Sequence, residues 1–471
     1  MWPSGQSVIN LMEPENIRFG GGAASTLLHP LVALVMAVAI VLILCLPRKY
    51  VMTPLLLAIF TIPLGQVVVL GGAHFTMARI LILAGLARLL ISRGSSPRSV
   101  FAGGLNTIDR AFLLWAVLFL AIFSLQEMKT QALIKSLGSF LDAVGGYILM
   151  RALIRDREDV QRTIKVFAAL CVLLGTSMII EQIIHLNVFG MLGGIPSMPA
   201  ERDGRIRSQA ALQVYLTAGA FGATLLPLLV WLWTEGKSKV VASLGILGAT
   251  AMTLTSNSST PQVAYAGGIV AICFWPARKQ MRLFRWGLVI TLLGLHLAMK
   301  APVWALINRL DLTGSSSSYH RFMLVDNCMR HFTDWWLLGY KYYDTWGFDM
   351  WDLSNQYVAY ALRGGLATLV MFLLIISRSF GRLGRARKLV EGNSNQEWLF
   401  WCLGCAMLSH IVVYFGVNYF DQMQFAWYAL LAIISAAVAG AASPAVRQSL
   451  KAVTFHTVIS SHETEFLEAV K

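Results

Sequence analysis

The residues best suited to chemistry lie in one stretch, from Ala301 to Gly365, that no long apolar run fills. This stretch is rich in Trp, Tyr, Asp and Arg, side chains that suit water or the boundary between water and lipid. Such side chains also bind polar ligands. A catalytic or recognition site is therefore expected here before anywhere else in the chain.

An amphipathic helix is predicted over residues 320–332. Apolar side chains recur there at spacings of three and four: Phe322, Val325, Met329 and Phe332. The other face carries a ladder of charges, namely Asp326, Arg330 and Asp334. Arg321 falls beside the apolar face, so we expect it to point toward the rest of the protein. A guanidinium in that setting needs an anion, either a substrate group or a carboxylate of another helix.

Acidic side chains in the aromatic segment that follows are candidates for proton transfer. Asp344, Asp349 and Asp352 can each act as an acid or a base, or instead cap a loop or pair with a cation. The Trp and Tyr residues around them either stack on sugar rings or form the belt that aromatic side chains make at a membrane surface.

A second polar segment, residues 182–211, also contains closely spaced cations. They are Arg202, Arg205 and Arg207. A phosphate-bearing ligand would account for them, because arginine binds phosphate through two parallel hydrogen bonds. The alternative is local pairing with Glu201 and Asp203, which would occupy two of the three.

The composition indicates which elements hold these residues. Of the 471 residues, 56% are hydrophobic and only 13% are charged, whereas about 25% charged residues are usual in soluble proteins. We therefore predict a single membrane domain, residues 1–471. The net charge of +14 lies largely in short loops between apolar runs, which favours the positive-inside rule over nucleic-acid binding.

Apolar runs of about 17–25 residues predict an all-α, polytopic bundle of transmembrane helices. The thirteen candidate spans are residues 27–46, 50–70, 76–92, 108–125, 133–154, 160–180, 212–233, 240–255, 261–275, 285–300, 355–377, 397–417 and 420–440. The two that flank residues 255–261 are short, so twelve spans is the alternative.

The charges of the connections predict the orientation of the bundle. Alternate loops are rich in Lys and Arg, and the loops that carry neither include residues 71–75, 256–260 and 418–419. The basic loops and the tail 441–471 are therefore predicted to be cytoplasmic. The large loop 301–354 and the segment 182–211 would then face the periplasm, with the bundle in a bacterial inner membrane.

Ionisable residues inside predicted spans are also candidates for function. They are Asp142, Glu181, Arg363 and His410. The charges concentrate toward the periplasmic side, which favours a site at that surface over a proton path through the bilayer. We predict no metal site, because the one CxxC pair, Cys402 and Cys405, has no second pair nearby.

The residues from Ser354 to Leu366 read SNQYVAYALRGGL. They resemble the pattern HNxYLxxLxxxGLxGL of the O-antigen ligase and polymerase superfamily of bacterial membrane glycosyltransferases. The matching residues are Asn355, Tyr357, Gly365 and Leu366. Arg321 falls where that family has an upstream arginine. Arg205 resembles an earlier arginine of the family, because both precede a helix rich in small residues.

Three departures from the family pattern are evident, one of which is the absence of the Asn-Pro that the family has between the earlier arginine and its helix. Ser354 stands where the family has a histidine that is thought to act on the acceptor hydroxyl. Asn257 stands where the family has an arginine at the end of a middle span. The chain is therefore expected to be a divergent member, in which Asp352 or His320 takes the place of the missing base.

The resemblance implies a metal-independent and cofactor-free transfer of glycan from an undecaprenyl-pyrophosphate carrier. The acceptor would be a second glycan or a lipid core, and membrane lipids and polysaccharide-assembly proteins would be the other partners. Arg205, Arg207 and Arg321 would meet the diphosphate. Ser354 marks the catalytic position of the motif, and the remaining candidates for substrate binding are Asn355, Tyr357 and Arg363.

Two other classes of function stay open at this point. A transporter or flippase for a lipid-linked or anionic substrate would need polar groups along a path that reaches both sides of the membrane. A non-catalytic subunit of a polysaccharide export machine would keep the fold but lack the base, as the serine at position 354 allows.

Overall fold

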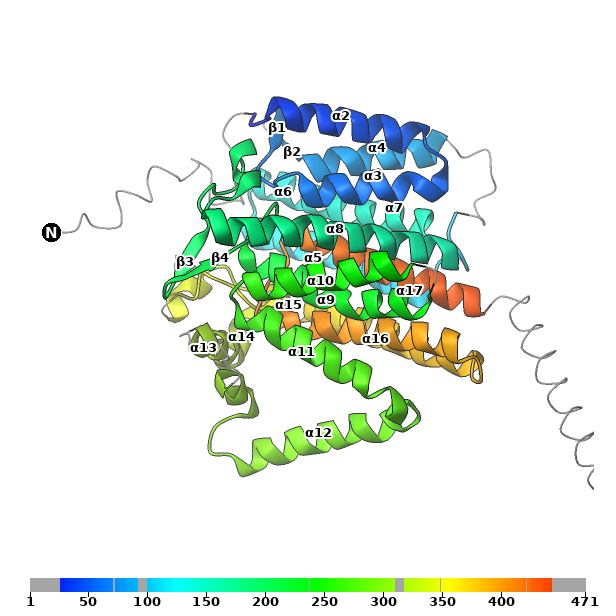
Figure 1. The fold of residues 1–471 in the computed structure, drawn as a ribbon. Helices are drawn as coiled ribbons and strands as arrows, with labels where there is room; N and C mark the ends of the chain where they lie inside the picture. Colours follow the sequence, from blue (N-terminus) through cyan, green and yellow to red (C-terminus); the bar gives the residue numbers. More distant parts are fainter. Residues whose placement is uncertain are drawn as a thin grey trace, which may run out of the picture.

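The chain folds into an all-α, polytopic helical bundle (Figure 1). The computed structural model describes residues 26–70, 73–91, 100–236, 238–309, 317–347, 349–420 and 422–442. The predicted tail lies outside the described residues beyond position 442.

The described residues of the first half of the chain form nine helical segments and two short β-hairpins. They are α2 (Pro30–Cys45), α3 (Arg48–Thr61), β1 (Val67–Leu70), β2 (Ala73–Thr76), α4 (Met77–Ile91), α5 (Thr107–Glu127), α6 (Thr130–Phe140), the π-helical turn η3 (Leu141–Gly145), α7 (Gly146–Leu153), α8 (Arg157–Ile184), the short 3-10 helix η4 (Val188–Leu192), β3 (Ala200–Arg202) and β4 (Arg205–Arg207). Strand β1 pairs antiparallel with β2, and β3 pairs antiparallel with β4.

The described residues of the second half form helices and connecting loops, and no strand. Its elements are α9 (Tyr215–Thr234), α10 (Lys239–Thr255), α11 (Ser259–Cys273), η5 (Trp275–Gln280), α12 (Met281–Ala298), η6 (Val303–Arg309), α13 (Ser317–Arg330), α14 (Phe332–Trp335), η7 (Tyr343–Trp346), α15 (Gln356–Leu389), α16 (Ser394–Tyr414) and α17 (Met423–Ala441).

Each predicted span contains a helical segment, with one clear error of length. Among the described residues, eight helices are long and apolar enough to cross a membrane, and α2 and α10 are apolar but shorter. The predicted second span, 50–70, is wrong at its end, because α3 stops at Thr61 and residues 67–70 form β1. A run of valines suits a strand as well as it suits a helix.

The bundle has two ends of different character. Basic loops lie together at one end, which we call the basic end. Ion pairs there join α3 to α8, α8 to the residue after α9, and η5 to α16. The β-hairpins, α13 and α14 lie at the opposite end, on the left in Figure 1, which we call the loop end. Hydrogen bonds join its connections: Gln182 Nε2 donates to Thr255 O at 3.0 Å, and Gln422 Nε2 donates to Ala211 O at 3.1 Å.

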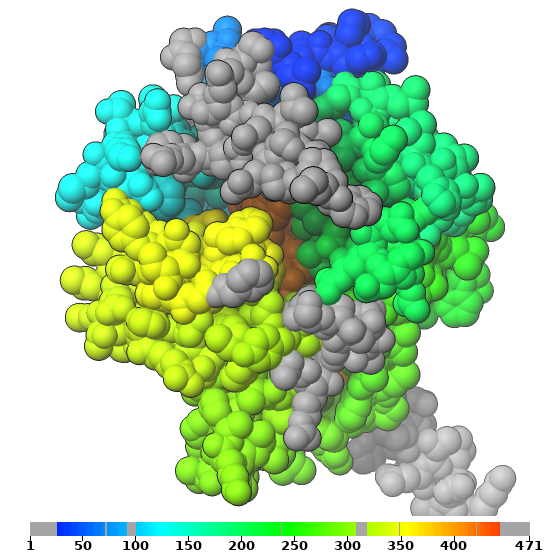
Figure 2. Space-filling model, turned by 90° about the vertical axis from the view of Figure 1, so that its left-hand side faces the viewer, coloured from blue at the N-terminus to red at the C-terminus, as the bar shows by residue number. Residues whose placement is uncertain are grey.

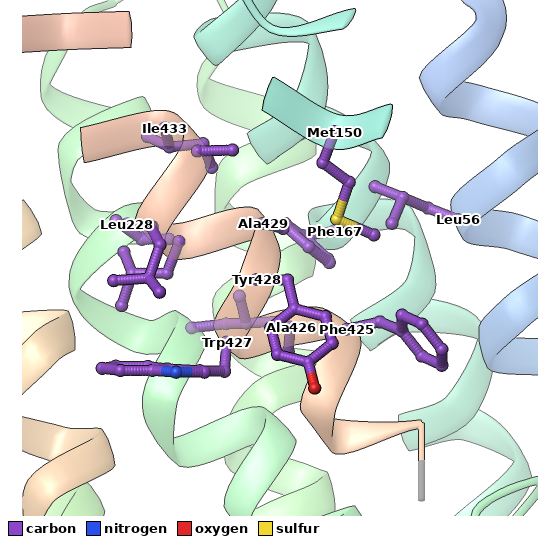
Figure 3. Close-up of a cluster of buried hydrophobic side chains, with 14 of the residues drawn as sticks. Leu56, Met150, Phe167, Leu228, Phe425, Ala426, Trp427, Tyr428, Ala429 and Ile433 are labelled. Atoms are coloured by element: carbon purple, nitrogen blue, oxygen red, sulfur yellow. The ribbon is translucent and has the colours of Figure 1, made fainter. Parts of the chain in front are cut away.

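Helix α17 forms the centre of the core. Its side chains Phe425, Tyr428 and Ile433 are buried among residues of the surrounding helices, including Leu56 of α3, Met150 of α7, Phe167 of α8 and Leu228 of α9 (Figure 3). In contrast, α12 stands away from the bundle and has no buried residue. An apolar helix without a buried side chain is compatible with contact to lipid on all sides.

Helix α15 is broken at Gly365, where the backbone leaves the helical conformation with φ 67° and ψ −179°. Residues after α14 replace the helical hydrogen bonds that the break removes. Leu366 N donates to Trp336 O at 2.9 Å, and Tyr340 N donates to Leu362 O at 2.7 Å. Backbone groups inside a bundle must find such substitutes wherever a helix is interrupted. The break therefore ties the large loop to the bundle.

The predicted amphipathic helix exists, but its buried face was assigned wrongly. Leu324 and Cys328 of α13 are buried and pack with the first turns of α15, whereas Met329 and Phe332 are exposed. Asp326, expected in solvent, is 7% exposed and receives a hydrogen bond from Trp304 Nε1 at 3.0 Å. Contact with α15, rather than the apolar periodicity of α13 alone, determines which face of α13 is buried.

Candidate functional site

The surface of the loop end is hollowed (Figure 2). Figure 2 views the molecule from this end and shows the surface depressed between the yellow chain of the large loop and the green chain near β3 and β4, with orange chain at the floor. Hydrogen bonds and close contacts bring together β4, the turn between α10 and α11, α13, the start of α15 and the end of α16.

Arg321 points from α13 toward the bundle, as predicted. Its side chain is buried, and Nη1 donates to Ser259 Oγ at 3.5 Å. The guanidinium passes so close to Gly416 that a Cβ atom there would lie 2.8 Å from Nε. Glycine at position 416 thus makes room for the arginine at the end of α16.

The three arginines of the β3–β4 hairpin have separate environments. Arg202 pairs with Asp203 at 3.7 Å, as the local-pairing alternative expected. Arg205 is exposed. Arg207 donates from Nη1 to the Tyr215 hydroxyl at 2.8 Å, and its guanidinium stands 4.8 Å above the Tyr215 ring. A guanidinium held by a neutral tyrosine keeps its full charge for an anionic ligand.

The turn between α10 and α11 contacts both the strand that carries Arg207 and the side chain of Arg321. Asn257 has a left-handed backbone (φ 43°), and its Nδ2 donates to Ile206 O at 2.6 Å. Ser259, two residues further along, is the residue that Arg321 contacts. Asn257 therefore positions β4 beside the turn.

His320 and Asp352 are neighbours at the rim of this region. His320 Nε2 lies 3.1 Å from Asp352 O, and Ser354 N donates to the same carbonyl at 2.9 Å. Removal of water from around the carboxyl raises the pKa of Asp352 above its ordinary value, against the lowering influence of His320. The predicted candidates for the base are therefore close together, and Ser354 adjoins them through its backbone.

Asn355 and Tyr357 have roles in holding helices together. Asn355 is fully buried and caps α15, with Oδ1 accepting from Tyr357 N and Val358 N at 3.0 and 3.1 Å. Its Nδ2 donates to Phe415 O at 3.3 Å, which ties α15 to the end of α16. The Tyr357 hydroxyl donates to Ile411 O at 3.2 Å. Both residues position the site, and neither side chain points freely into the hollow.

Arg363 lies apart from the other candidates. It sits one residue before the Gly364–Gly365 pair and is half-buried, near the positive charge of Lys135 on α6. Among the described residues it shows no ion pair. The structure therefore does not bring Arg363 to the same hydrogen-bonded group as Arg321.

Sequence reasoning missed three buried glutamines at the loop end. Gln209, Gln356 and Gln422 are 5%, 1% and 1% exposed. Among the described residues, one amide atom of each has no hydrogen-bond partner: Nε2 of Gln209, Nε2 of Gln356 and Oε1 of Gln422. Buried polar atoms of this kind call for a ligand or ordered water. The available signal was the occurrence of glutamine next to apolar runs.

The other ionisable residues of the spans serve the fold. Glu181 accepts from Ala210 N at 3.0 Å and from Gln209 N, and so fixes the segment after β4. His410 Nδ1 lies 2.8 Å from the Tyr419 hydroxyl. Asp142 forms two hydrogen bonds with Arg79, at 3.0 and 2.6 Å.

Replacing Asp142 by alanine is expected to lower the free energy of unfolding by about 3–5 kcal/mol, because Arg79 is left without its carboxylate inside the bundle. The double variant Arg79→Met/Asp142→Leu should recover most of that loss. Equilibrium unfolding of the detergent-solubilised protein measures both. A loss below about 1 kcal/mol for Asp142→Ala would show that the pair contributes little.

No protein-family model matches the chain, and no curated protein is significantly similar to it. The resemblance to the O-antigen ligase and polymerase superfamily therefore stays a prediction from the motif residues.

The arrangement is chemically suited to a polyanionic, hydroxyl-rich ligand. Arg207 and Arg321 provide positive charge on either side of the α10–α11 turn, Asp352 and His320 provide proton-accepting groups, and the buried glutamines provide neutral donors and acceptors. Such a combination can bind a sugar diphosphate and transfer a proton beside it.

Proposed function

We propose that this chain is a membrane glycosyltransferase of the O-antigen ligase and polymerase type. In the proposed reaction an acceptor hydroxyl attacks the anomeric carbon of a glycan carried on undecaprenyl pyrophosphate. The bond between that carbon and the diphosphate oxygen breaks, and undecaprenyl pyrophosphate leaves. The acceptor is a second lipid-linked glycan or a lipid core.

The observation that carries the proposal is the position of Arg321. A buried guanidinium at the inner side of a large loop, one turn away from the strand that bears Arg207, can stabilise the negative charge that develops on a departing diphosphate. Hydrogen bonds to phosphate from arginine are about twice as strong as those between neutral groups. Arg205, exposed on the same strand, would contact the diphosphate as it enters.

The acceptor proton would pass to Asp352, with His320 beside it. Ser354 cannot accept that proton at neutral pH, because a serine hydroxyl is a weak base. The raised pKa of the Asp352 carboxyl brings it closer to the range in which a base works well.

A pH profile tests this role. The ionised form of Asp352 is the active base, so transfer should fall as the pH drops through its pKa, and that fall should lie above the ordinary aspartate value of about 3.9. Asp352→Asn should reduce the rate by about 10²–10⁴-fold and remove this limb of the profile. An unchanged limb in Asp352→Asn would assign the proton to another group, and His320→Gln is then the variant to measure.

The proposed setting is a bacterial inner membrane with the loop end in the periplasm and the basic end in the cytoplasm. The support for it is the gathering of basic loops at one end of the bundle, since such loops remain cytoplasmic. Single cysteines at Ser197 and Arg385, in a variant without the native cysteines, would report the sidedness. An impermeant maleimide added to whole spheroplasts should label position 197 and spare position 385.

The function itself is tested in proteoliposomes. Purified protein is reconstituted with fluorescent undecaprenyl-pyrophosphate oligosaccharide, and the products are separated by length. A glycosyltransferase gives longer lipid-linked products. A flippase moves the label across the bilayer without lengthening it, and a non-catalytic subunit does neither, so each rival predicts a different result.

A further inference from the structure

The basic end of the bundle contains a cavity that the proposed reaction does not use. It measures about 370 Å³ and is lined by Ala102, Gly103, Asn106, Arg382, Ser435, Ala439 and Ala442. These residues come from the segment just before α5, from the second half of α15 and from the end of α17. A single ordered water needs only about 10–15 Å³, so the cavity has room for a larger group.

Several hydrogen-bond donors at this cavity have no acceptor among the described residues. Nδ2 of Asn106, a residue 7% exposed, is buried without a partner, and so is Nε of Arg382. Nη1 of Arg151, a residue 1% exposed, is likewise without an acceptor. Arg151 lies directly behind the cavity wall, because its Nη2 donates to the carbonyl of Ala102 at 2.7 Å. Buried donors of charged groups are costly unless an acceptor binds them.

The charges around the cavity favour an anion. Asp109 is the carboxylate nearest to the two arginines, and it is already used, accepting from Arg151 Nε at 3.3 Å and from Asn106 N at 2.7 Å. Arg382 also feels the charge of Arg385 on the same helix. Two guanidinium groups against one carboxylate leave a net positive charge. The N-terminus of α5, capped by Asn106, adds the positive end of a helix dipole.

We propose that this cavity binds a phosphate group at the basic end of the bundle. Arg382 and Asn106 contact the phosphate oxygens, and Arg151 supplies charge from behind the wall. The phosphate belongs either to the headgroup of an anionic phospholipid or to a soluble phosphate. The position of the cavity among basic loops suits both, since such loops lie at headgroup depth.

The test uses the full-length protein in phosphatidylcholine nanodiscs. Inorganic phosphate is titrated at constant ionic strength in one arm, and phosphatidylglycerol replaces part of the phosphatidylcholine in the other. The rise in unfolding temperature with ligand gives the affinity. A response in the first arm alone identifies a soluble phosphate, and a response in the second alone identifies a lipid headgroup. Either supports the proposal, and no response in both arms overturns it.

Two variants and one control locate the binding. Arg382→Gln should weaken binding at least about tenfold, whereas Arg385→Gln removes an equal charge from an exposed position and should change it less than about twofold. Ala439→Leu retains every charge but fills the cavity, and should also weaken binding at least about tenfold. Equal losses in Arg382→Gln and Arg385→Gln, or unchanged affinity in Ala439→Leu, would place the binding outside the cavity and overturn the proposal. If Arg382→Gln does not fold, Ala439→Leu decides.

Discussion

Arg321→Ala is expected to abolish the formation of long glycan while the amount of folded protein stays unchanged. The side chain is buried at the α10–α11 turn, where it would stabilise the departing diphosphate. Loss of one donor to a developing anion typically costs about 10²–10³-fold in rate. The measurement is the rate of transfer by the purified variant, together with its unfolding temperature.

Arg330→Ala is the matched control for this prediction. Arg330 is on the same helix, is exposed, and pairs with Asp326 at 2.7 Å instead of facing the hollow. We expect its transfer rate to stay within about twofold of the original. Arg321→Lys keeps the charge but loses the two-pronged geometry, and should fall between the two. Normal glycan from Arg321→Ala would remove Arg321 from the site.

Gly365→Ala is expected to destabilise the protein by about 3 kcal/mol or more. The backbone at Gly365 has φ 67° and ψ −179°, a region that only glycine occupies without strain of about 1–3 kcal/mol. An added Cβ would also lie 2.5 Å from Leu337 O, so the loop that closes the break in α15 would have to move. Equilibrium unfolding in detergent measures the loss.

Gly381→Ala on the same helix is the control, and its effect should have the opposite sign. Gly381 lies in a regular part of α15, and a Cβ atom there would meet nothing within 4 Å. Alanine should therefore stabilise the helix by up to about 1 kcal/mol. If Gly365→Ala also proved neutral, the break in α15 would not be a fixed feature of the fold.

Much of the fold could be predicted because burial in a bilayer requires long apolar helices. Hydropathy located a helical segment in every predicted span, and the charge of the loops separated the two ends of the bundle. The sequence could not reveal the hairpin of β1 and β2 or the break at Gly365. Both depend on contacts with distant segments, since Leu27 pairs with Val67, and Trp336 O replaces a helical acceptor for Leu366.

The candidate site was also predictable only in part, because contacts between distant segments determine which of its side chains are buried. The inward direction of Arg321 was correct although the apolar face of α13 was not, because contact with α15 selects Leu324 and Cys328 for burial. Asn355 and Tyr357 matched a motif, yet their side chains cap and join helices. The buried glutamines Gln209, Gln356 and Gln422 were missed, because they lie far apart in the chain and share no local pattern.

The most direct measurement of the central claim is a structure of the protein with undecaprenyl pyrophosphate in a lipid nanodisc. We expect the diphosphate in the hollow of the loop end, within hydrogen-bond distance of Arg321 and beside the strand that carries Arg207. A hollow without the diphosphate, or a diphosphate held at the loop end while Arg321 stays turned to Ser259 and makes no contact with it, would contradict the central claim.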